Sequence, residues 1–514
     1  MPRTLLLTGC DLTRQDFADV VLNGRRVRLH PSARRAMTAS RRVVERLIRE
    51  KRLVYAVTTG VGSLSTEHID PAQARDLQLN VVRSHCCGVG EPLDVAETRG
   101  LLLLRANALA AGLSGIRPQV AELLCGILNQ RLHPVVPSRG SVGASGDLAP
   151  LAHVARTLVG EGEVTVDSRL ERRGRPVAAA AALRRTGLEP LTLEAKEGIS
   201  LVNGTQAMLS LGLLALRQAE ILVDTADVAG ALSLDALRGS PVAFDERLQA
   251  ARPHPGQIET ARNLRRLNRG SAIRESHRDC ARVQDAYSLR CMPQVHGAVR
   301  DALGFARRTF EIEMNSATDN PLVFAAEGEV LSGGNFHGQL VATALDLMAI
   351  ALAQLGGISE RRIDRVVNPL TSDLPPFLAG SPGLESGLMM AQVTAAALAS
   401  ENKVLAHPAS VDSIPTSGNK EDYVSMGMAA ALKLKQTVTN TASILAIELL
   451  TAAHALDRLR PLATGRLALK AKRLVQRVSP PFRSDRAWAP EIARLTAQVL
   501  QGEYAGVLRP KSAD

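Results

Sequence analysis

Five long stretches of periodic apolar residues constrain the fold of this chain more than any other feature. They cover residues 205–237, 294–315, 338–364, 386–406 and 424–457. Each is longer than the usual helix of a globular protein, and helices of this length bury their apolar sides against one another in bundles. We therefore predict a mainly α-helical fold built on a bundle of long helices.

The first 200 residues show a more varied pattern. Residues 1–30 alternate short apolar runs with polar turns, which predicts a small pair of strands. Residues 53–62 are apolar and β-branched and then rich in glycine, which predicts a short strand that enters a loop. In a chain of 514 residues more than one core is expected. We place a mixed N-terminal domain at residues 1–200 and a C-terminal long-helix domain at 201–514.

The net charge of +11 narrows the possible partners, because most of it comes from arginines spread along the chain. No basic run is interleaved with aromatic residues, as base stacking would require. No apolar run reaches the roughly 20 residues of a membrane span, and the apolar patch at the N-terminus is too short for a secretory signal. We interpret the charge as solvated helix faces, expect no nucleic-acid or membrane partner, and predict a cytoplasmic protein.

The cysteines give no sign of a metal site or a disulfide framework. None forms a CxxC pair, and no Cys/His cluster has the spacing of a zinc site. We therefore expect no metal and reduced thiols at all six positions, which are Cys10, Cys86, Cys87, Cys125, Cys280 and Cys291.

The segment with the most unusual chemistry is Gly143-Ala144-Ser145-Gly146-Asp147, which lies between two helical stretches. One interpretation is a turn in which Ser145 or Asp147 caps the following helix. The other is chemical. If the Gly146 nitrogen attacks the Ala144 carbonyl and Ser145 loses water, a five-membered ring with an exocyclic methylidene forms. Such a ring is a strong electrophile, but the tripeptide alone favours the turn.

The wider run GSVGASGDLAPLAHVA (140–155) closely resembles the signature of the aromatic amino-acid ammonia-lyases and aminomutases, whose prosthetic group is methylidene-imidazolone. The resemblance spans nearly the whole chain, and the block at 401–427 is most similar to the histidine ammonia-lyases of that family. Further similar motifs follow in order: YAVTTGVG (55–62), LQLNVVRSHCCGVG (77–90), KEGISLVNGTQ (196–206), VQDAYSLRCMPQVHGA (283–298), NSATDNPLVF (315–324), LSGGNFHGQLVA (331–342), ISERRI (358–363) and ENKVLAHPASVDSIPTSGNKEDYVSMG (401–427).

The resemblance implies a specific cofactor and assembly. Ala144, Ser145 and Gly146 would form the prosthetic group themselves, through an Ala144–Gly146 imidazolinone cross-link and dehydration of Ser145, without a metal or a soluble cofactor. The family assembles as homotetramers whose sites draw residues from more than one subunit. The chain lacks the additional shielding domain of the plant phenylalanine enzymes, so a plain bacterial-type architecture is expected.

The resemblance also assigns roles around the prosthetic group. Tyr55 would be the general base for the β-proton, and Asn203 would form or hold the prosthetic group. Arg290 would bind the substrate carboxylate through its planar fork, and Tyr287, with a catalytic role, and Gln284 would complete that polar lining. The remaining matched positions would surround the substrate ring or the prosthetic group: His85, Phe336, Met389 and Glu421.

Each of these residues also has a plainer interpretation. Tyr55 and Phe336 could be core aromatics, His85 a structural side chain and Asn203 a helix cap. Residues 284–290 could form a surface face rich in ion pairs, although Tyr287 and Arg290 would share one side of a helix at i, i+3 spacing. A glutamate in a polar loop such as Glu421 is usually only solvated.

Three functions remain open at this point. The leading one is elimination of ammonia from L-histidine to give trans-urocanate, the first step of histidine degradation, because Glu421 can accept a hydrogen bond from an imidazole N–H. The second is a lyase or 2,3-aminomutase acting on tyrosine or phenylalanine. It is favoured by HGQL at 337–340, and Ala286, Lys420 and Tyr423 also differ from the usual histidine pattern. The third is a non-catalytic helical scaffold, which would be expected to lack Ser145, Tyr55 or Arg290.

Overall fold

The computed structural model describes residues 3–166, 174–278, 280, 283–482 and 484–509. Helices dominate these residues, and strands form only four sheets of two or three strands each. The prediction of a mainly α-helical fold is confirmed. The five long stretches correspond to α9 (Gln206–Ala236), α14 (Met292–Glu313), α15 (Gln339–Val367), α16 (Met389–Leu405) and α17 (Gly427–Asp457).

The chain divides into two compact units, and each unit is assembled from separate segments. Unit 1 comprises Met1–Leu214, Arg307–Leu345 and Pro408–Leu432, and unit 2 comprises Ala215–Ala306, Asp346–His407 and Lys433–Asp514. We expected one division near residue 200. The first division instead follows Leu214, and the chain returns to unit 1 twice, because α9, α14, α15 and α17 each contribute residues to both units.

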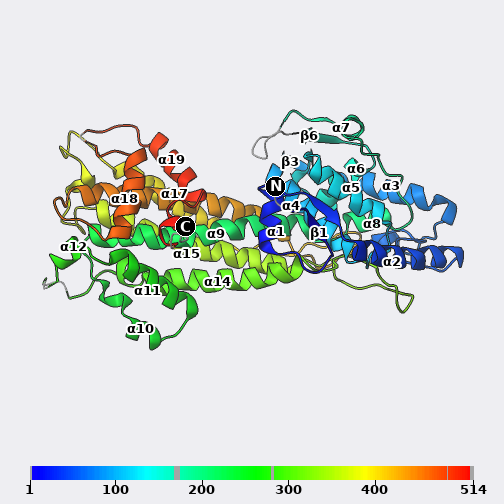
Figure 1. Ribbon diagram of the computed structural model, residues 1–514, viewed down its shortest axis with the longest axis horizontal. Helices are drawn as coiled ribbons and strands as arrows, with labels where there is room; N and C mark the ends of the chain where they lie inside the picture. The colour runs from blue at the N-terminus through cyan, green and yellow to red at the C-terminus, as the bar shows by residue number, and fades with distance from the viewer. Residues whose placement is uncertain (1–2, 167–173, 279, 281–282, 483, 510–514) are drawn as a thin grey trace. The chain divides into compact units, whose positions relative to one another are not determined.

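Unit 1 contains the mixed secondary structure expected of the N-terminal region (Figure 1). Its core is α4, where Leu101, Leu102 and Leu103 are each 0% exposed because neighbouring helices, above all α5, cover it on several sides. Its helices are α1 (Arg14–Val21), α2 (Pro31–Arg49), α3 (Ala74–His85), α4 (Val95–Ala110), α5 (Pro118–Asn129), α6 (Leu148–Leu158), α7 (Ala179–Arg185) and α8 (Glu197–Val202), with 3-10 turns at Gly62–Leu64 and Pro71–Gln73.

The strands of unit 1 are short and form four small sheets. The expected pair within residues 1–30 is present as the parallel strands β1 (Leu5–Leu7) and β2 (Val27–Leu29). The other pairs are antiparallel: β3 (Val89–Pro92) with β5 (Pro137–Arg139), β6 (Glu163–Val166) with both β4 (Leu132–Pro134) and β7 (Val177–Ala178), and β8 (Leu322–Phe324) with β9 (Glu329–Leu331).

The strand predicted at residues 53–62 is wrong. These residues form turns, and a single bridge joins Thr59 to His68. The Thr58 hydroxyl donates to the Arg52 carbonyl at 2.9 Å and accepts from the Val54 amide at 2.9 Å, and Ala56 has a φ of +57°. Threonine side chains that bond their own backbone offer it an alternative to a strand ladder.

The regular elements of unit 2 are all helices among its described residues. In addition to its parts of the long helices it contains α10 (Glu246–Ala250), α11 (Pro255–Asn268), α12 (Ala272–Glu275), α13 (Tyr287–Arg290), α18 (Arg466–Val478) and α19 (Ala489–Leu500), with 3-10 turns at Pro241–Phe244, Pro376–Leu378 and Ala505–Val507.

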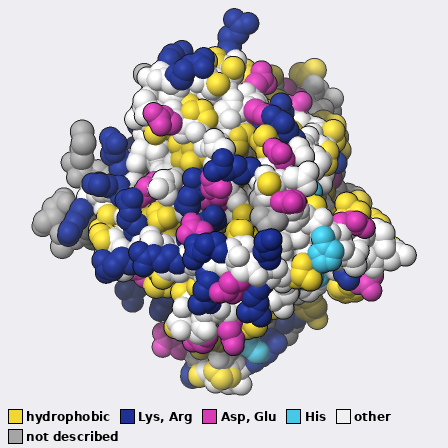
Figure 2. Space-filling view, turned by 90° about the vertical axis from the view of Figure 1, so that its right-hand side faces the viewer, with side chains coloured by type: hydrophobic (Ala, Val, Ile, Leu, Met, Phe, Trp, Pro, Cys, Tyr) yellow, Lys and Arg dark blue, Asp and Glu magenta, His cyan; other side chains and the backbone are white. Residues whose placement is uncertain are grey.

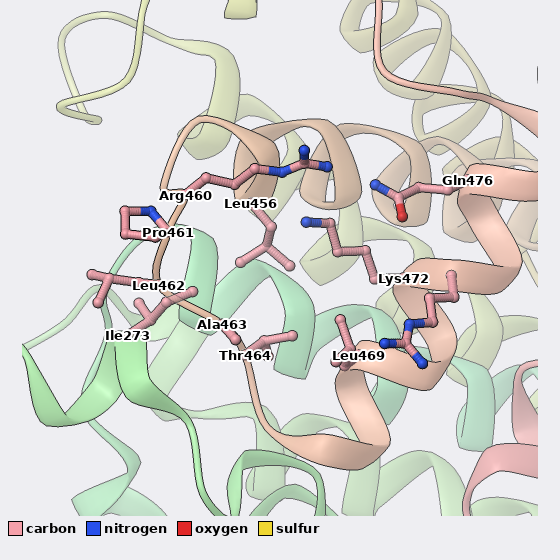
Figure 3. Close-up of a pocket in the computed structure, with 11 residues that line it drawn as sticks. Ile273, Leu456, Arg460, Pro461, Leu462, Ala463, Thr464, Leu469, Lys472 and Gln476 are labelled. Atoms are coloured by element: carbon pink, nitrogen blue, oxygen red, sulfur yellow. The ribbon is translucent and has the colours of Figure 1, made fainter.

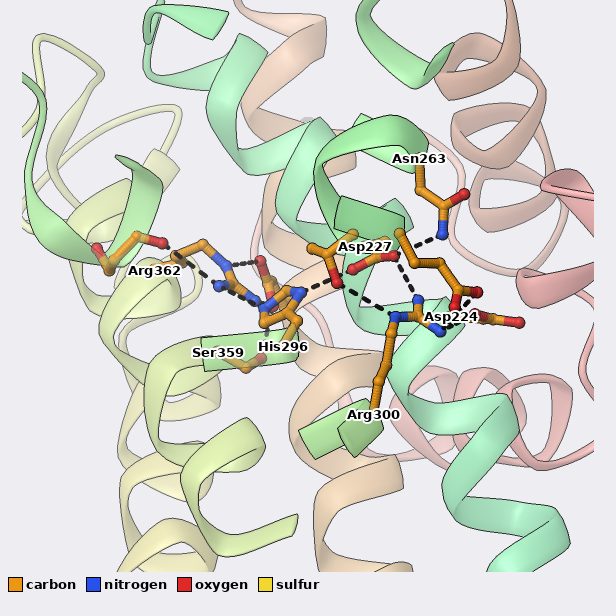
Figure 4. A network of polar contacts seen from close by, with 11 residues as sticks. Asp224, Asp227, Asn263, His296, Arg300, Ser359 and Arg362 are labelled. Carbon is orange, nitrogen blue, oxygen red and sulfur yellow. Dashed lines mark hydrogen bonds and ion pairs between the residues drawn. The ribbon is translucent and has the colours of Figure 1, made fainter. Parts of the chain in front are cut away.

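A buried network of charges joins the long helices inside unit 2 (Figure 4). Arg362 on α15 makes two bonds to Glu448 on α17, at 2.5 and 2.9 Å, and both side chains are 0% exposed. The buried His296 on α14 approaches Arg362 at 3.3 Å and Asp227 on α9 at 2.8 Å. Burial lowers the pKa of His296, which favours its neutral form. Because each charge has a partner, the network holds these helices together without an isolated buried ion.

Two helices, α9 and α15, are long and apolar enough to cross a membrane by length and composition alone. However, 72% and 61% of their most apolar windows are buried inside the protein, and the core helix of a soluble protein passes the same test. Figure 2 shows Lys and Arg side chains scattered over one face of the molecule and interspersed with Asp and Glu. This distribution matches the interpretation of the arginines as solvated helix faces.

Candidate active site

The segment around Ser145 folds into a tight turn in unit 1. The Gly146 amide donates to the Gly143 carbonyl at 3.2 Å, and Ser145 has a φ of +49°, a left-handed conformation that is uncommon for serine. Gly146 has a φ of +79°, and a Cβ there would lie 2.1 Å from the Gly204 carbonyl oxygen. Glycine is therefore required at position 146, and the backbone of the turn is strained at Ser145.

The turn does not serve as an ordinary helix cap. Asp147 occupies the N-cap position of α6, but no side chain caps that helix. The Asp147 carboxylate instead accepts from the Met208 amide at 2.8 Å and the Ser141 hydroxyl at 3.3 Å. Because Asp147 is fully buried, its pKa is raised to about 7. The interpretation of this segment as a turn plus cap is therefore not supported.

Gly204 holds the turn from both sides of Gly146. Its amide donates to the Ser145 carbonyl at 3.2 Å, and its carbonyl accepts from the Asp147 amide at 2.7 Å. The preceding residue, Asn203, is the C-cap of α8 and is 3% exposed. Its side-chain amide donates to Asp319 at 3.3 Å and to the Asn320 carbonyl at 3.2 Å. Asn203 is therefore a buried, hydrogen-bonded neighbour of the Ser145 turn.

Glu421 meets Ser145 although 276 positions separate them in the sequence. The Ser145 hydroxyl donates to Glu421 Oε1 at 3.4 Å, and the Thr416 hydroxyl donates to Oε2 at 2.9 Å. Thr416 and Glu421 also form an antiparallel bridge, which fixes the backbone of the loop. Glu421 is thus a positioned acceptor next to the Ser145 turn and not a freely solvated side chain.

Tyr55 lies in a loop that is tied to the Glu421 loop. The Tyr55 hydroxyl oxygen accepts from the Gly62 amide at 2.9 Å. The next amide, that of Ser63, approaches the hydroxyl of Ser417 at 3.4 Å. A Cβ at Gly62, where φ is +57°, would lie 2.6 Å from that hydroxyl. The Tyr55 loop therefore reaches the segment that carries Glu421.

His85 is the last residue of α3, and its ring is oriented by its own helix. Its Nδ1 lies 2.7 Å from the Val81 carbonyl oxygen and 3.1 Å from the Ser84 hydroxyl. Because a carbonyl only accepts, the contact requires that Nδ1 carries a hydrogen, which leaves Nε2 to face away from this contact.

Phe336 and His337 belong to a segment that packs near the Ser145 turn. His337 Nε2 lies 3.1 Å from the Tyr423 carbonyl oxygen, and the two rings stack with centroids 6.3 Å apart. The following loop reaches the turn, because the Met426 amide donates to the Val142 carbonyl at 2.9 Å. Phe336 is half-buried and directly precedes His337, which contacts Tyr423 in the loop beside the turn.

The other expected site residues belong to unit 2. Tyr287 is 71% exposed, and the guanidinium of Arg290 lies 4.6 Å from the centroid of its ring, as the i, i+3 spacing predicts. Arg290 Nε is buried and has no hydrogen-bond partner among the described residues. Arg290 therefore retains a donor for an anion. The remaining two are Gln284, which is exposed, and Met389, which begins α16.

Two residues at the site were not predicted from the sequence. One is Asp147, which we considered only as a cap. The other is Arg105, a fully buried arginine of α4 that donates to the Asn203 carbonyl at 2.8 Å. A charged residue in the middle of the apolar run of α4 is a signal that could have identified it.

The described part of the chain contains no metal-ligand cluster, and a large cavity lies away from the expected site residues. No group of three His, Cys, Asp or Glu side chains could hold a metal ion there. A cavity of about 590 Å³ in unit 2 is lined by none of the expected site residues, and Figure 3 shows Lys472 pointing into it. Asp457 partly neutralises the positive charge of the cavity lining, because Lys472 and Arg460 each lie 2.8 Å from its carboxylate.

Comparisons with known proteins agree with the motifs. The family described as aromatic amino acid lyase matches residues 12–478. The histidine ammonia-lyase of Koribacter versatilis (strain Ellin345) is 57% identical, covering 99% of this chain and 100% of that protein. The histidine ammonia-lyase of Myxococcus xanthus (strain DK1622) is 50% identical, covering 99% of both.

Solved structures of related proteins have the same fold. A tyrosine aminomutase from Streptomyces globisporus superimposes with a TM-score of 0.92 at 39% identity, covering 98% of both chains. A histidine ammonia-lyase from Trypanosoma cruzi superimposes with a TM-score of 0.89 at 40% identity, covering 99% of this chain and 96% of that chain.

Proposed function

The chain belongs to the aromatic amino acid lyase family, and from this premise we propose that it eliminates ammonia from L-histidine to give trans-urocanate, the first step of histidine degradation. Two histidine ammonia-lyases match almost the whole chain at 57% and 50% identity, which supports histidine as the substrate.

The observation that carries the choice of substrate is the position of Glu421 at 3.4 Å from the Ser145 hydroxyl. A carboxylate at this point accepts a hydrogen bond from an imidazole N–H, whereas a phenyl ring offers it no donor. The loss of such a bond discriminates strongly against a substrate that cannot make it.

The Ser145 turn fits the methylidene-imidazolone group. Ring closure between Ala144 and Gly146 needs a backbone that folds back on itself and a nitrogen without a neighbouring Cβ. The φ of +49° at Ser145 and the tight contact of Gly146 with Gly204 meet these needs. When formed, this group supplies an electrophile that activates the substrate for loss of its amine.

The residues around the turn bind the substrate and move its proton. Tyr55 takes the β-proton, and the Gly62 amide stabilises negative charge on its oxygen. Arg290 binds the carboxylate, and Gln284 and Tyr287 complete the polar lining. The carboxylate of Glu421 orients the imidazole. Asn203 holds the turn, and the remaining lining residues are His85, Phe336 and Met389.

The exposure of Tyr287 supports a shared site. An aromatic site residue that is 71% exposed in the single chain needs a further surface to enclose it. We place Gln284, Tyr287, Arg290 and Met389 in the site of a neighbouring subunit of a cytoplasmic homotetramer. No nucleic acid, membrane or metal takes part in this proposal.

Product identification with the purified protein tests the proposal. The protein is incubated separately with L-histidine, L-tyrosine and L-phenylalanine, and urocanate is distinguished from the cinnamates by absorbance. We expect product from histidine alone, and a Ser145→Ala variant should form none. Formation of a cinnamate but no urocanate would contradict the choice of substrate.

A 2,3-aminomutase acting on tyrosine is the second candidate. It is supported by the run HGQL at 337–340 and by the similarity to the tyrosine aminomutase structure. Chromatography of the tyrosine reaction for a β-amino acid tests it, and the absence of this product excludes it.

A further inference from the structure

Arg105 is a buried charge that the proposed mechanism does not use. It lies in the middle of α4, is 1% exposed, and burial lowers its pKa to about 10, so it remains charged at neutral pH. Its guanidinium binds the C-terminal end of α8. Nη1 donates to the Asn203 carbonyl at 2.8 Å and to Gln206 Oε1 at 3.0 Å, and Nη2 donates to the Ser200 carbonyl. A cation at this point satisfies carbonyls that the helix leaves unpaired.

These bonds fix the residue that holds the Ser145 turn. Gly204 directly follows Asn203, and it bonds to the chain on both sides of Gly146. Gly204 also lies against the guanidinium, because a Cβ there would be 2.7 Å from Arg105 Nη1. A displacement of Arg105 is therefore transmitted through one residue to the Ser145 carbonyl.

A second buried pair anchors the same helix end from the other side. Lys196 Nζ lies 3.0 Å from Asp319 Oδ2 and 2.9 Å from the Ser200 hydroxyl, and Asp319 Oδ1 accepts from the Asn203 side chain. With Asn203 fixed through both its carbonyl and its side chain, the position of Gly204 has little freedom. The arrangement is rigid in the place where the turn must be held.

We infer that Arg105 is a positioning residue for closure of the ring between Ala144 and Gly146. This inference rests on the proposed function, because it requires that the ring forms. In the first step the Gly146 nitrogen bonds to the Ala144 carbonyl carbon, and the carbonyl oxygen leaves as water with the N–H hydrogens of Ser145 and Gly146. In the second step Ser145 loses its Cα hydrogen and its side-chain hydroxyl as water. Arg105 touches none of these atoms and acts through Gly204.

The same helix provides a matched control in Arg99. Arg99 is also 1% exposed, and burial lowers its pKa to about 10 as well. It donates to the carbonyls of Val20, Val21 and Leu128, which lie at the ends of α1 and α5 and not at the end of α8. Substitution of either arginine therefore disturbs a buried guanidinium bound to helix ends, but only Arg105 is connected to the turn.

The test compares Arg105→Lys with Arg99→Lys in the full-length protein by intact mass under denaturing conditions. Formation of the ring removes two waters, so the wild-type protein should be about 36 Da lighter than its sequence predicts. A lysine cannot span the same carbonyls. We expect ring formation in Arg105→Lys to be about tenfold slower than in wild type, while Arg99→Lys carries the full mass loss and has a similarly reduced melting temperature.

The possible results separate the inference from the function on which it rests. A wild-type protein without the mass loss would refute the proposed prosthetic group, and the inference with it. A wild-type protein with the loss, together with Arg105→Lys at the same rate, would overturn the inference alone. An equal slowing in both variants would also overturn it, because it would reflect general destabilisation.

A second variant covers the case in which Arg105→Lys does not fold. Gln206→Leu keeps roughly the volume of the side chain, and it removes one acceptor of the guanidinium and the bond from Gln206 Nε2 to the Thr318 hydroxyl. We expect a smaller slowing, about two- to threefold, with a modest decrease in melting temperature. Ring formation at the wild-type rate in this variant would overturn the inference.

Discussion

At the scale of single residues, the environment of a side chain decides what it can do in this protein. Glu421, in a polar loop, has one oxygen on the Thr416 hydroxyl and the other 3.4 Å from Ser145. Asp147 follows the reactive tripeptide but is buried and bonded to the Met208 amide. One carboxylate is therefore available to a substrate, and the other belongs to the framework of the turn.

We expect Glu421→Gln to lower kcat/KM for L-histidine by roughly 10- to 100-fold, because a hydrogen bond to a charged group contributes about 1.5–3 kcal/mol. Steady-state kinetics measure the loss, and the intact mass should still show the ring. Glu385→Gln is the control, since the Glu385 carboxylate is likewise hydrogen-bonded in a loop, to the Gly380 and Ser381 amides, but has no role in the site. Unchanged kinetics in Glu421→Gln would contradict the role of Glu421.

Asp147 should make stability depend on pH. Its pKa is raised from 3.8 to about 7 by burial, so the folded state holds a proton that the unfolded state has lost between these values. Stability from this group is therefore complete at low pH and is lost as the pH rises through about 7. Urea unfolding at pH 5 and pH 8 should show a smaller decrease in Asp147→Asn than in wild type. An equal decrease in both proteins would contradict the assignment.

At the scale of elements, the sequence predicts the long helices well and the short elements poorly. The periodic stretch at 424–457 corresponds to α17 at Gly427–Asp457 because a helix of this length is stabilised by its own packed apolar face. Residues 53–62 have the composition of a strand, but Thr58 bonds its own backbone. Local hydrogen bonds of this kind are not encoded in periodicity.

Only part of the candidate site could be predicted from the sequence. Motifs similar to those of the family pointed to Ser145, Glu421 and Asn203, and the structure shows the hydrogen bonds that these residues make. Arg105 was missed because no motif includes it, and its partners are backbone carbonyls that any residue could supply. The sequence therefore identified the residues with distinctive chemistry, but not the residue that holds their backbone.

The buried pair of Arg362 and Glu448 gives a prediction for the long helices. Both side chains are 0% exposed, so Arg362→Met should leave the Glu448 carboxylate buried without a cation, bonded to the Ser233 and Ser359 hydroxyls, and lower the free energy of unfolding by about 3–5 kcal/mol. The double variant Arg362→Met with Glu448→Leu removes both charges and should recover most of that loss. Urea unfolding measures both changes. A double variant less stable than Arg362→Met would contradict the argument.

At the scale of the whole molecule, the residues proposed for the site occur in both units of the chain. Ser145, Asn203 and Glu421 are connected within unit 1, whereas Tyr287 and Arg290 belong to unit 2. Tyr287 is exposed, and Arg290 keeps a buried donor without a partner among the described residues. Both features are expected of residues whose partners come from another subunit, as in a closed symmetric oligomer.

Complementation between inactive variants tests this division. Ser145→Ala and Arg290→Ala should each be inactive alone. If one site combines the turn of one subunit with Arg290 of another, random mixing in co-expressed tetramers restores about one quarter of the sites. The activity of the purified mixture with L-histidine, measured per subunit, reports this fraction.

The matched control pairs Ser145→Ala with Glu421→Ala. Ser145 and Glu421 are in contact within one chain, so a site needs both from the same subunit, and no mixed tetramer contains an intact pair. The activity of this mixture should not exceed that of the more active of the two single variants. Recovery in both mixtures would mean that the subunits exchange segments more freely than proposed, and recovery in neither would place Arg290 and Ser145 in the site of the same chain.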